Sequence, residues 1–291
     1  MIMAADKDVL RTDLPKIYQK TGDAAIRSER LFLTWSLINF SVLAVGAISS
    51  SLKTWFHTSG AIAGAVLLGS GAVMSFWLRR SRYERRWYRS RAVAESVKTL
   101  SWRYMTCASP FEGGSSNAEA EASKRFDELV HEIAVQEEAA VPEPHEITPK
   151  MREVRQRSVL DRAKLYLKER VGDQRTWYAD NAEKNEKMGR RVLYFAVAAQ
   201  GAACVLALML IAGDVQDFTG LFATISASAL GWMQLKKYED LAEAYLTAAK
   251  ELSKIAASID GTSSDDELSR FVLDAENAIS REHTLWIAKR I

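Results

Sequence analysis

Four stretches of the chain carry no charged side chain, and segments rich in charged residues separate them. They cover residues 31–52, 58–78, 192–213 and 218–235, with lengths of 22, 21, 22 and 18 residues. A helix of about 20 residues crosses a hydrocarbon core of about 30 Å, and it satisfies its own backbone hydrogen bonds there. The pattern therefore predicts an integral membrane protein with four transmembrane helices.

The segments between these runs also predict helices. Ala, Leu, Glu, Lys and Arg dominate them, and no run alternates between apolar and polar residues as a strand would. Thr148 and Pro149 are typical of a helix start, and Ser264 and Glu267 have the spacing of a capping box. We therefore expect an all-α protein with two tandem transmembrane helical hairpins and long cytoplasmic helices.

The two halves of the chain repeat one another. Tyr18 precedes the first run as Tyr178 precedes the third, and Tyr83-Glu84 follows the second run as Tyr238-Glu239 follows the fourth. We predict a first unit at 1–138, a Pro-containing linker at 139–150 and a second unit at 151–291. Both units have the same topology, which distinguishes this duplication from the inverted repeats of many transporters.

Basic residues predict the orientation of the hairpins. Arg27 and Arg30 precede the first run, seven arginines lie between residues 79 and 91, and the loop between the first two runs holds one lysine. The second hairpin repeats this asymmetry, with Asp214 and Asp217 in its loop. Because positive loops stay inside, we expect a multi-pass protein of the bacterial inner membrane with both termini in the cytoplasm.

A few polar residues interrupt the apolar runs. Asn39 and Gln200 each lie eight positions into the first run of their unit, and Thr224 and Ser228 lie in the fourth. In one interpretation these residues are interhelical contacts that, with neighbouring glycines and alanines, hold the bundle together. In the other they line an ion path formed by several copies of the chain. Both interpretations stay open for different helix faces.

The cytoplasmic helices carry the most specific sequence. Residues 87–105 and 274–286 contain six candidate residues for assembly or gating: Trp87, Glu95, Trp102, Arg103, Glu282 and Trp286. The aromatic residues also fit an apolar stripe that packs against Phe126, Leu129 and Ile133, and Glu95 and Arg103 suit interhelical ion pairs. A gate latch or a site for an activating anion is the functional alternative for the charged residues.

These two segments, each attached to a hairpin, resemble the SLATT superfamily. Its members are two-transmembrane effector domains associated with SMODS nucleotide synthetases and SLOG proteins in bacteria. The resemblance covers nearly the whole chain as two tandem copies. It implies a pore-forming effector of a bacterial conflict or antiphage system that permeabilises the inner membrane on activation. It also implies partners from a nucleotide-second-messenger system or an associated defence protein.

Composition and motif content argue against several other classes of function. The formal net charge of +2 argues against bulk capture of nucleic acid, and the two cysteines, Cys107 and Cys204, offer no disulfide framework. No Gly-rich phosphate loop, Cys-x-x-Cys pair or paired metal-ligand spacing occurs, so we expect no cofactor, no metal and no enzyme. The expected partners are the lipid bilayer and further copies of the chain. The alternative function is a non-conducting membrane anchor that recruits a soluble partner through the cytoplasmic helices.

Overall fold

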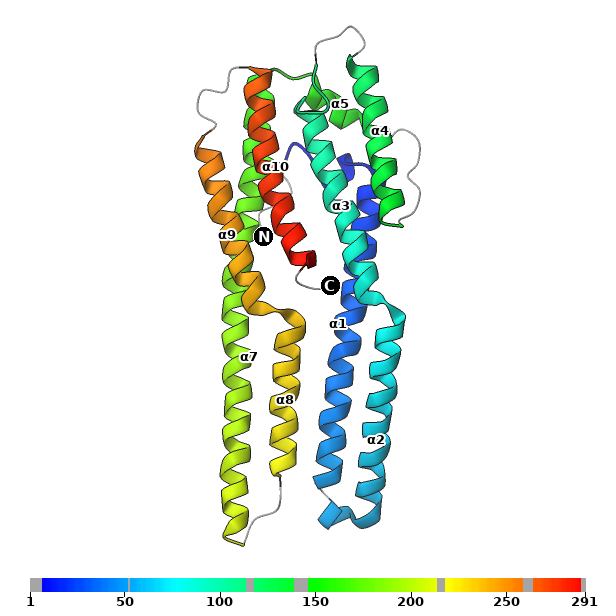
Figure 1. The fold of residues 1–291 in the computed structure, drawn as a ribbon, viewed down its shortest axis with the longest axis vertical. Coiled ribbons are helices and arrows are strands. Elements are labelled where there is room, and N and C mark those ends of the chain that lie inside the picture. Colours follow the sequence, from blue (N-terminus) through cyan, green and yellow to red (C-terminus); the bar gives the residue numbers. More distant parts are fainter. Residues whose placement is uncertain are drawn as a thin grey trace. The chain divides into compact units, whose positions relative to one another are not determined.

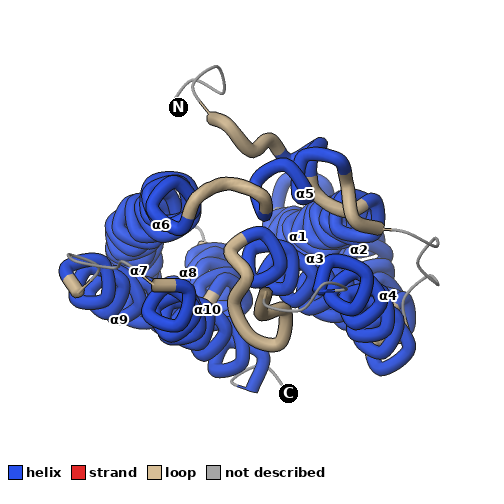
Figure 2. The backbone as a smooth tube through the Cα atoms, turned by 90° about the horizontal axis from the view of Figure 1, so that it is seen from above, coloured by secondary structure: helices blue, strands red, loops and turns tan. Residues whose placement is uncertain are grey.

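The computed structural model describes residues 7–51, 53–113, 118–138, 146–213, 218–258 and 264–288, apart from the side chains of residues 50–57 and 281–288. These residues form helices joined by loops and contain no strand (Figure 2), which confirms the all-α prediction. Ten α-helices are described: α1 (Lys16–Ser51), α2 (Lys53–Ser81), α3 (Tyr83–Met105), α4 (Ala118–Gln136), α5 (Pro149–Arg155), α6 (Val159–Tyr166), α7 (Asp173–Ile211), α8 (Thr219–Lys236), α9 (Tyr238–Ala257) and α10 (Asp265–Ala288). A short 3₁₀ turn, η2 (Arg11–Asp13), precedes α1, and a π-helical turn, η3 (Leu167–Gly172), joins α6 to α7.

The chain folds into two compact units. The apolar unit contains Glu29–Glu84 and Glu183–Ala242, and the polar unit contains Met1–Ser28, Arg85–Ala182 and Glu243–Ile291. Each unit therefore takes residues from both halves of the sequence. The two repeats share their cores instead of folding as two independent domains.

Two predicted helix starts are confirmed by their capping contacts. The Thr148 side chain accepts a hydrogen bond from the backbone N–H of Met151, with Pro149 in the first turn of α5. At the start of α10, Ser264 and Glu267 each accept the other's backbone N–H at 3.3 Å. Both caps satisfy N–H groups that the helix itself leaves unpaired.

The repeat is visible in the backbone. Arg82 has φ 52° and Lys237 has φ 49°, and these left-handed residues separate α2 from α3 and α8 from α9. Each stands directly before one of the two matching Tyr-Glu pairs, Tyr83-Glu84 and Tyr238-Glu239. In each repeat the helix before the hairpin loop, α1 or α7, is long and unbroken, whereas the chain that returns is divided at this residue into α2 and α3 or α8 and α9 (Figure 1).

Small residues bring the helices of the apolar unit together. A Cβ atom added to Gly71 of α2 would lie 2.7 Å from Leu43 of α1, and one added to Gly231 of α8 would lie 3.2 Å from the Phe40 ring of α1. The Ser226 hydroxyl of α8 donates a hydrogen bond to the Ala196 carbonyl of α7 at 2.9 Å. These contacts support the predicted packing by small residues.

Three helical stretches are long and apolar enough to cross a membrane. They lie within Lys16–Ser49, Thr58–Met105 and Val159–Ile211, and they contain all of the second uncharged run and most of the first and third. The fourth run forms α8, which has 18 residues and is not among these three. The prediction of membrane spans is therefore supported for three helices, and the fourth span stays a prediction.

Candidate functional site

A buried ion pair lies at the centre of the polar unit. Arg170 of η3 donates from Nε to Glu276 Oε1 at 2.8 Å and from Nη2 to Oε2 at 2.7 Å, and the two side chains are 1% and 2% exposed. Tyr166 donates to Glu276 Oε1 at 3.0 Å, and Thr99 donates to Oε2 at 2.8 Å. We call these four residues the Glu276 cluster. It joins α3 of the first repeat to α6, η3 and α10.

Burial sets the energetics of this cluster. Two charges removed from water are costly, and they persist only when good geometry and further hydrogen bonds satisfy them. Burial alone would lower the pKa of Arg170, but the charge and hydrogen bonds of Glu276 outweigh it and raise that pKa. Burial and the neighbouring carboxylate also raise the pKa of Tyr166 well above its ordinary value, so this hydroxyl stays a donor. Arg170 Nη1 is buried without a hydrogen-bond partner.

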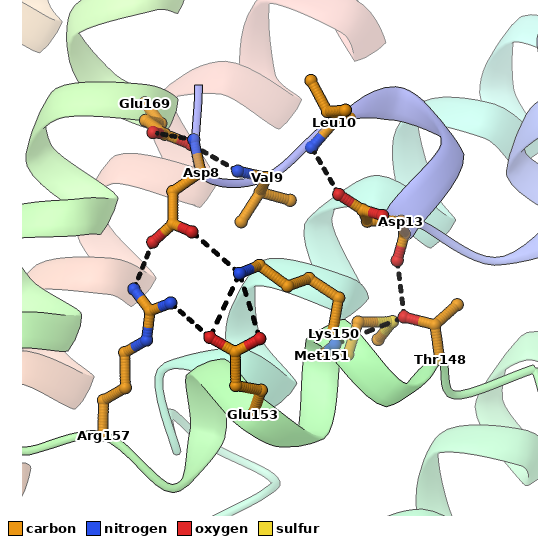
Figure 3. Close-up of polar contacts among 10 residues, drawn as sticks. All are labelled: Asp8, Val9, Leu10, Asp13, Thr148, Lys150, Met151, Glu153, Arg157 and Glu169. Carbon is orange, nitrogen blue, oxygen red and sulfur yellow. Dashed lines mark hydrogen bonds and ion pairs between the residues drawn. The ribbon is translucent and has the colours of Figure 1, made fainter. Parts of the chain in front are cut away.

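The N-terminal segment is held by a second network on the neighbouring face of η3 (Figure 3). The Glu169 carboxylate accepts the backbone N–H groups of Asp8 at 2.7 Å and Val9 at 3.0 Å. The Asp8 side chain in turn forms ion pairs with Arg157 and, at 2.8 Å, with Lys150. These hydrogen bonds lower the pKa of Asp8 from 3.8 to about 2. We call this set of contacts the N-terminal clamp.

The π-helical turn η3 contributes one residue to each of these two networks. Consecutive residues of η3, Glu169 and Arg170, contact the N-terminal segment and α10 respectively. An open depression of about 530 Å³ borders the clamp, lined by Asp8, Arg157, Asp161, Lys164, Leu165, Lys168 and Glu169. Its charges are mixed, so no single class of ligand is favoured there.

The predicted residues of the polar helices occupy different environments. Trp87 and Trp102 are buried, and the Trp102 ring meets Tyr166 edge-on at 5.7 Å, which confirms that they pack in a core. Arg103 donates from Nε to the Ser109 carbonyl at 2.6 Å, and Glu95 is half-buried on α3. The side chains of Glu282 and Trp286 lie outside the described residues. Phe126 of α4 is buried and its ring lies 5.7 Å from that of Tyr104 of α3, whereas Leu129 and Ile133, which were also predicted to pack there, are only half-buried.

The two amides of the apolar unit differ in their surroundings. Asn39 is 8% exposed and donates from Nδ2 to the Ser75 hydroxyl of α2 at 2.8 Å, while its Oδ1 atom is buried without a hydrogen-bond partner. Gln200 lies on an exposed face of α7. Thr224 donates to the carbonyl of Gly220 in its own helix at 2.8 Å, and Ser228 is half-exposed on α8. Thr224 and Ser228 lie one turn apart on α8, but no hydrogen bond joins any of the four residues to another in the described part of the chain. Their place in the lining of an ion path stays a prediction.

The Glu276 cluster was missed from the sequence, although a signal for it exists. Glu276 falls on the same helical face as the buried residues Val272, Ala275 and Ile279. A charge on an apolar stripe requires a buried partner. The partner itself, Arg170, lies 106 positions earlier in the chain, and no spacing rule connects the two. Among the described residues, no group of His, Cys, Asp and Glu side chains is arranged to hold a metal ion.

These features define a multi-pass membrane protein built from two hairpin repeats whose polar helices share one core. Residues 15–163 match the SMODS and SLOG-associating 2TM effector domain 3, and residues 166–286 match the SMODS and SLOG-associating 2TM effector domain 1. The chain therefore belongs to the SLATT superfamily and carries two of its domains in tandem, as the sequence motifs predict. Comparisons with curated proteins and with solved structures gave no significant match.

The family assigns a general role to the chain. SLATT domains are two-transmembrane effector domains associated with conflict or defence systems. The matched ranges meet near residues 163–166, at the end of α6, and the predicted boundary at 139–150 stays a prediction. The Glu276 cluster takes Thr99 from the first matched range and its other three residues from the second.

Proposed function

We propose that the chain is a non-enzymatic effector that permeabilises the bacterial inner membrane during conflict or antiphage defence. In this proposal all four uncharged runs span the membrane, and both termini and the polar unit lie in the cytoplasm. Several copies assemble and open an aqueous path after a signal from a nucleotide-second-messenger system or an associated protein.

The observation that carries the proposal is an unpaired polar atom in the apolar unit. Asn39 Oδ1 is buried within a helix long enough to span a bilayer, and it lacks a hydrogen-bond partner. An unpaired carbonyl at that depth costs free energy unless it finds another partner or water. An inert anchor gains nothing from this cost, whereas a helix bundle that admits water when it rearranges compensates for it.

Two long helices suggest how a signal at the polar unit could control the path through the membrane. Helix α1 and helix α7 each begin among the polar segments and continue without a break into an uncharged run. A rearrangement at η3, where Glu169 and Arg170 make their contacts, would therefore act on the helix that continues into the third uncharged run. Packed interfaces of this kind switch between discrete arrangements instead of deforming continuously.

The test is depolarisation of bacterial cells that express the chain, followed with a voltage-sensitive dye, together with leakage from vesicles that contain the purified protein. Asn39→Leu is compared with Ser41→Ala, whose hydroxyl bonds within its own helix to Leu37 at 2.9 Å. We expect depolarisation and leakage with the wild type and with Ser41→Ala, and altered conductance with Asn39→Leu. If neither cells nor vesicles leak at matched abundance, the chain is a scaffold instead.

A further inference from the structure

The Gln200 amide lies on an exposed face of a membrane-spanning helix. Gln200 is the ninth residue of the uncharged run at 192–213, which places it near the middle of the span. The buried residues of this part of α7 are Ala196, Ala199 and Ala203, and Gln200 lies beside that stripe. No hydrogen bond joins its amide to another residue in the described part of the chain.

Other polar residues of the apolar unit satisfy themselves locally. Ser36, Ser41 and Thr224 donate to carbonyls four residues earlier in their own helices, at 2.7, 2.9 and 2.8 Å. A glutamine amide carries two N–H donors and a carbonyl acceptor. The backbone N–H groups within a helix are already paired, so the helix offers no donor to the amide oxygen. Within a single chain, the Gln200 amide therefore lacks hydrogen-bond partners.

The residues around Gln200 form a regular seam on this face. Val197, Gln200, Cys204, Ala207 and Ile211 follow one another at spacings of three and four residues; Ala207 is half-buried and the other four are exposed. This spacing is that of helices that pack in a left-handed pair. Gly201 borders this seam, and a Cβ atom added to it would meet nothing within 4 Å, so a second helix can approach closely at that edge.

We propose that α7 of one copy packs against α7 of a second copy along this seam, with the two Gln200 amides hydrogen-bonded to each other. The two copies are related by a two-fold axis along the membrane normal. This places each Gln200 at the same depth as its equivalent, and an amide supplies both the donor and the acceptor that such a pair needs.

A second copy fits better than another occupant because the seam is uncharged and its polar group is self-complementary. Lipid tails offer no hydrogen-bond partner to an amide at this depth. Polar pairs between identical helices are also known to fix register in helix dimers. The inference rests on the proposed membrane span of α7 and names the partner contact that the proposed assembly requires.

Cys204 provides a direct test because it lies in the seam one turn after Gln200. It is exposed, whereas the other cysteine, Cys107, is buried, and burial raises the pKa of the Cys107 thiol. Membranes that contain the full-length chain are oxidised with copper phenanthroline and analysed on a non-reducing gel. Thiols of two chains join only when their Cα atoms come within about 7 Å.

Two variants serve as controls. Cys204→Ser removes the reporter, and Cys204→Ser/Val205→Cys moves it to an equally deep exposed position that points away from the seam. We expect a covalent dimer from the wild type and little from either control. Gln200→Leu should lower the dimer fraction about three- to tenfold at limiting protein density, and Gln200→Asn should restore part of it.

Each result decides the inference separately from the proposed function. Equal cross-linking through positions 204 and 205, or none through Cys204 in membranes that hold the chain, overturns the α7 pairing. An unchanged dimer fraction in Gln200→Leu also overturns it. Depolarisation without the Cys204 dimer leaves the pore proposal standing and removes this interface. A Cys204 dimer without depolarisation or leakage supports the α7 pairing and removes the pore proposal.

Discussion

Removal of Arg170 from the Glu276 cluster should destabilise the polar unit strongly. In Arg170→Met the carboxylate keeps the Tyr166 and Thr99 hydroxyls as donors but loses two charged hydrogen bonds at 2.7 and 2.8 Å. Because the remaining charge is 2% exposed, the expected loss is about 3–5 kcal/mol, the usual cost of breaking a buried pair from one side. At about 2–4 °C per kcal/mol, this lowers the melting temperature by roughly 6–20 °C.

A second substitution separates lost charge compensation from lost packing. In Arg170→Met/Glu276→Gln the amide oxygen still accepts hydrogen bonds from Tyr166 and Thr99, and no uncompensated charge remains. We therefore expect the double variant to be more stable than Arg170→Met alone.

The assay is unfolding of the purified full-length chain in detergent micelles. Hydrogen exchange measured over α10 assigns the loss to the polar unit, because the exchange rate there follows local opening. A loss below about 1 kcal/mol in Arg170→Met would refute the argument, since such a loss is usual for a surface ion pair. A double variant no more stable than Arg170→Met alone would refute the role of charge.

Three further expectations test other parts of the structure. Asp8, with its pKa lowered from 3.8 to about 2, stabilises the N-terminal clamp above pH 3.8, and this contribution disappears as the pH falls through about 2. Because Asp8 is partly exposed, Asp8→Asn should cost at most about 1 kcal/mol and mainly speed amide exchange at residues 8–9; unchanged exchange contradicts the clamp. Burial and the Glu119 carboxylate raise the pKa of Tyr104 to about 12, so its contribution is complete below pH 10 and is lost between pH 10 and about 12, which ultraviolet titration will detect. The Tyr104 hydroxyl donates to Glu119 Oε1, and a Tyr104 that ionises near pH 10 in the folded chain would show this hydrogen bond to be absent. Gly71→Ala, whose new Cβ would lie 2.7 Å from Leu43, should destabilise the apolar unit by about 1–3 kcal/mol, whereas Gly69→Ala enters open space and should not; equal melting temperatures of the two would disprove close packing at Gly71.

Much of the fold follows from local sequence. The uncharged runs predicted the membrane helices, since their length and lack of charge suffice to identify a spanning helix. The start of α5 at Thr148-Pro149 and the capping box of α10 were also predicted, because a helix cap depends on residues three or four positions apart. Arg82 and Lys237, the left-handed residues of the two repeats, carry no local signal as strong as a glycine would.

The candidate sites could not be predicted as fully from the sequence. Asn39 and Gln200 occupy equivalent positions in the two repeats, yet one is buried against Ser75 and the other is exposed on α7. The spacing of residues along one helix gives the faces of that helix but not which face meets a neighbour. The apolar face of α3 therefore placed Trp102 correctly in a core. The Glu276 cluster beside it was not predicted, because its residues come from distant helices.

The sequence alone determined that the protein is all-α, that it is built from tandem hairpins and that its helices are apolar enough to enter a membrane, because these properties depend on neighbours within a few turns. Only the tertiary structure decided that the two repeats share one polar core, with Arg170 and Glu276 paired across 106 positions. It also decided that Gln200 faces outward. Pairing of buried charges and the choice of the exposed face depend on how distant helices pack, and that information is spread over the whole chain.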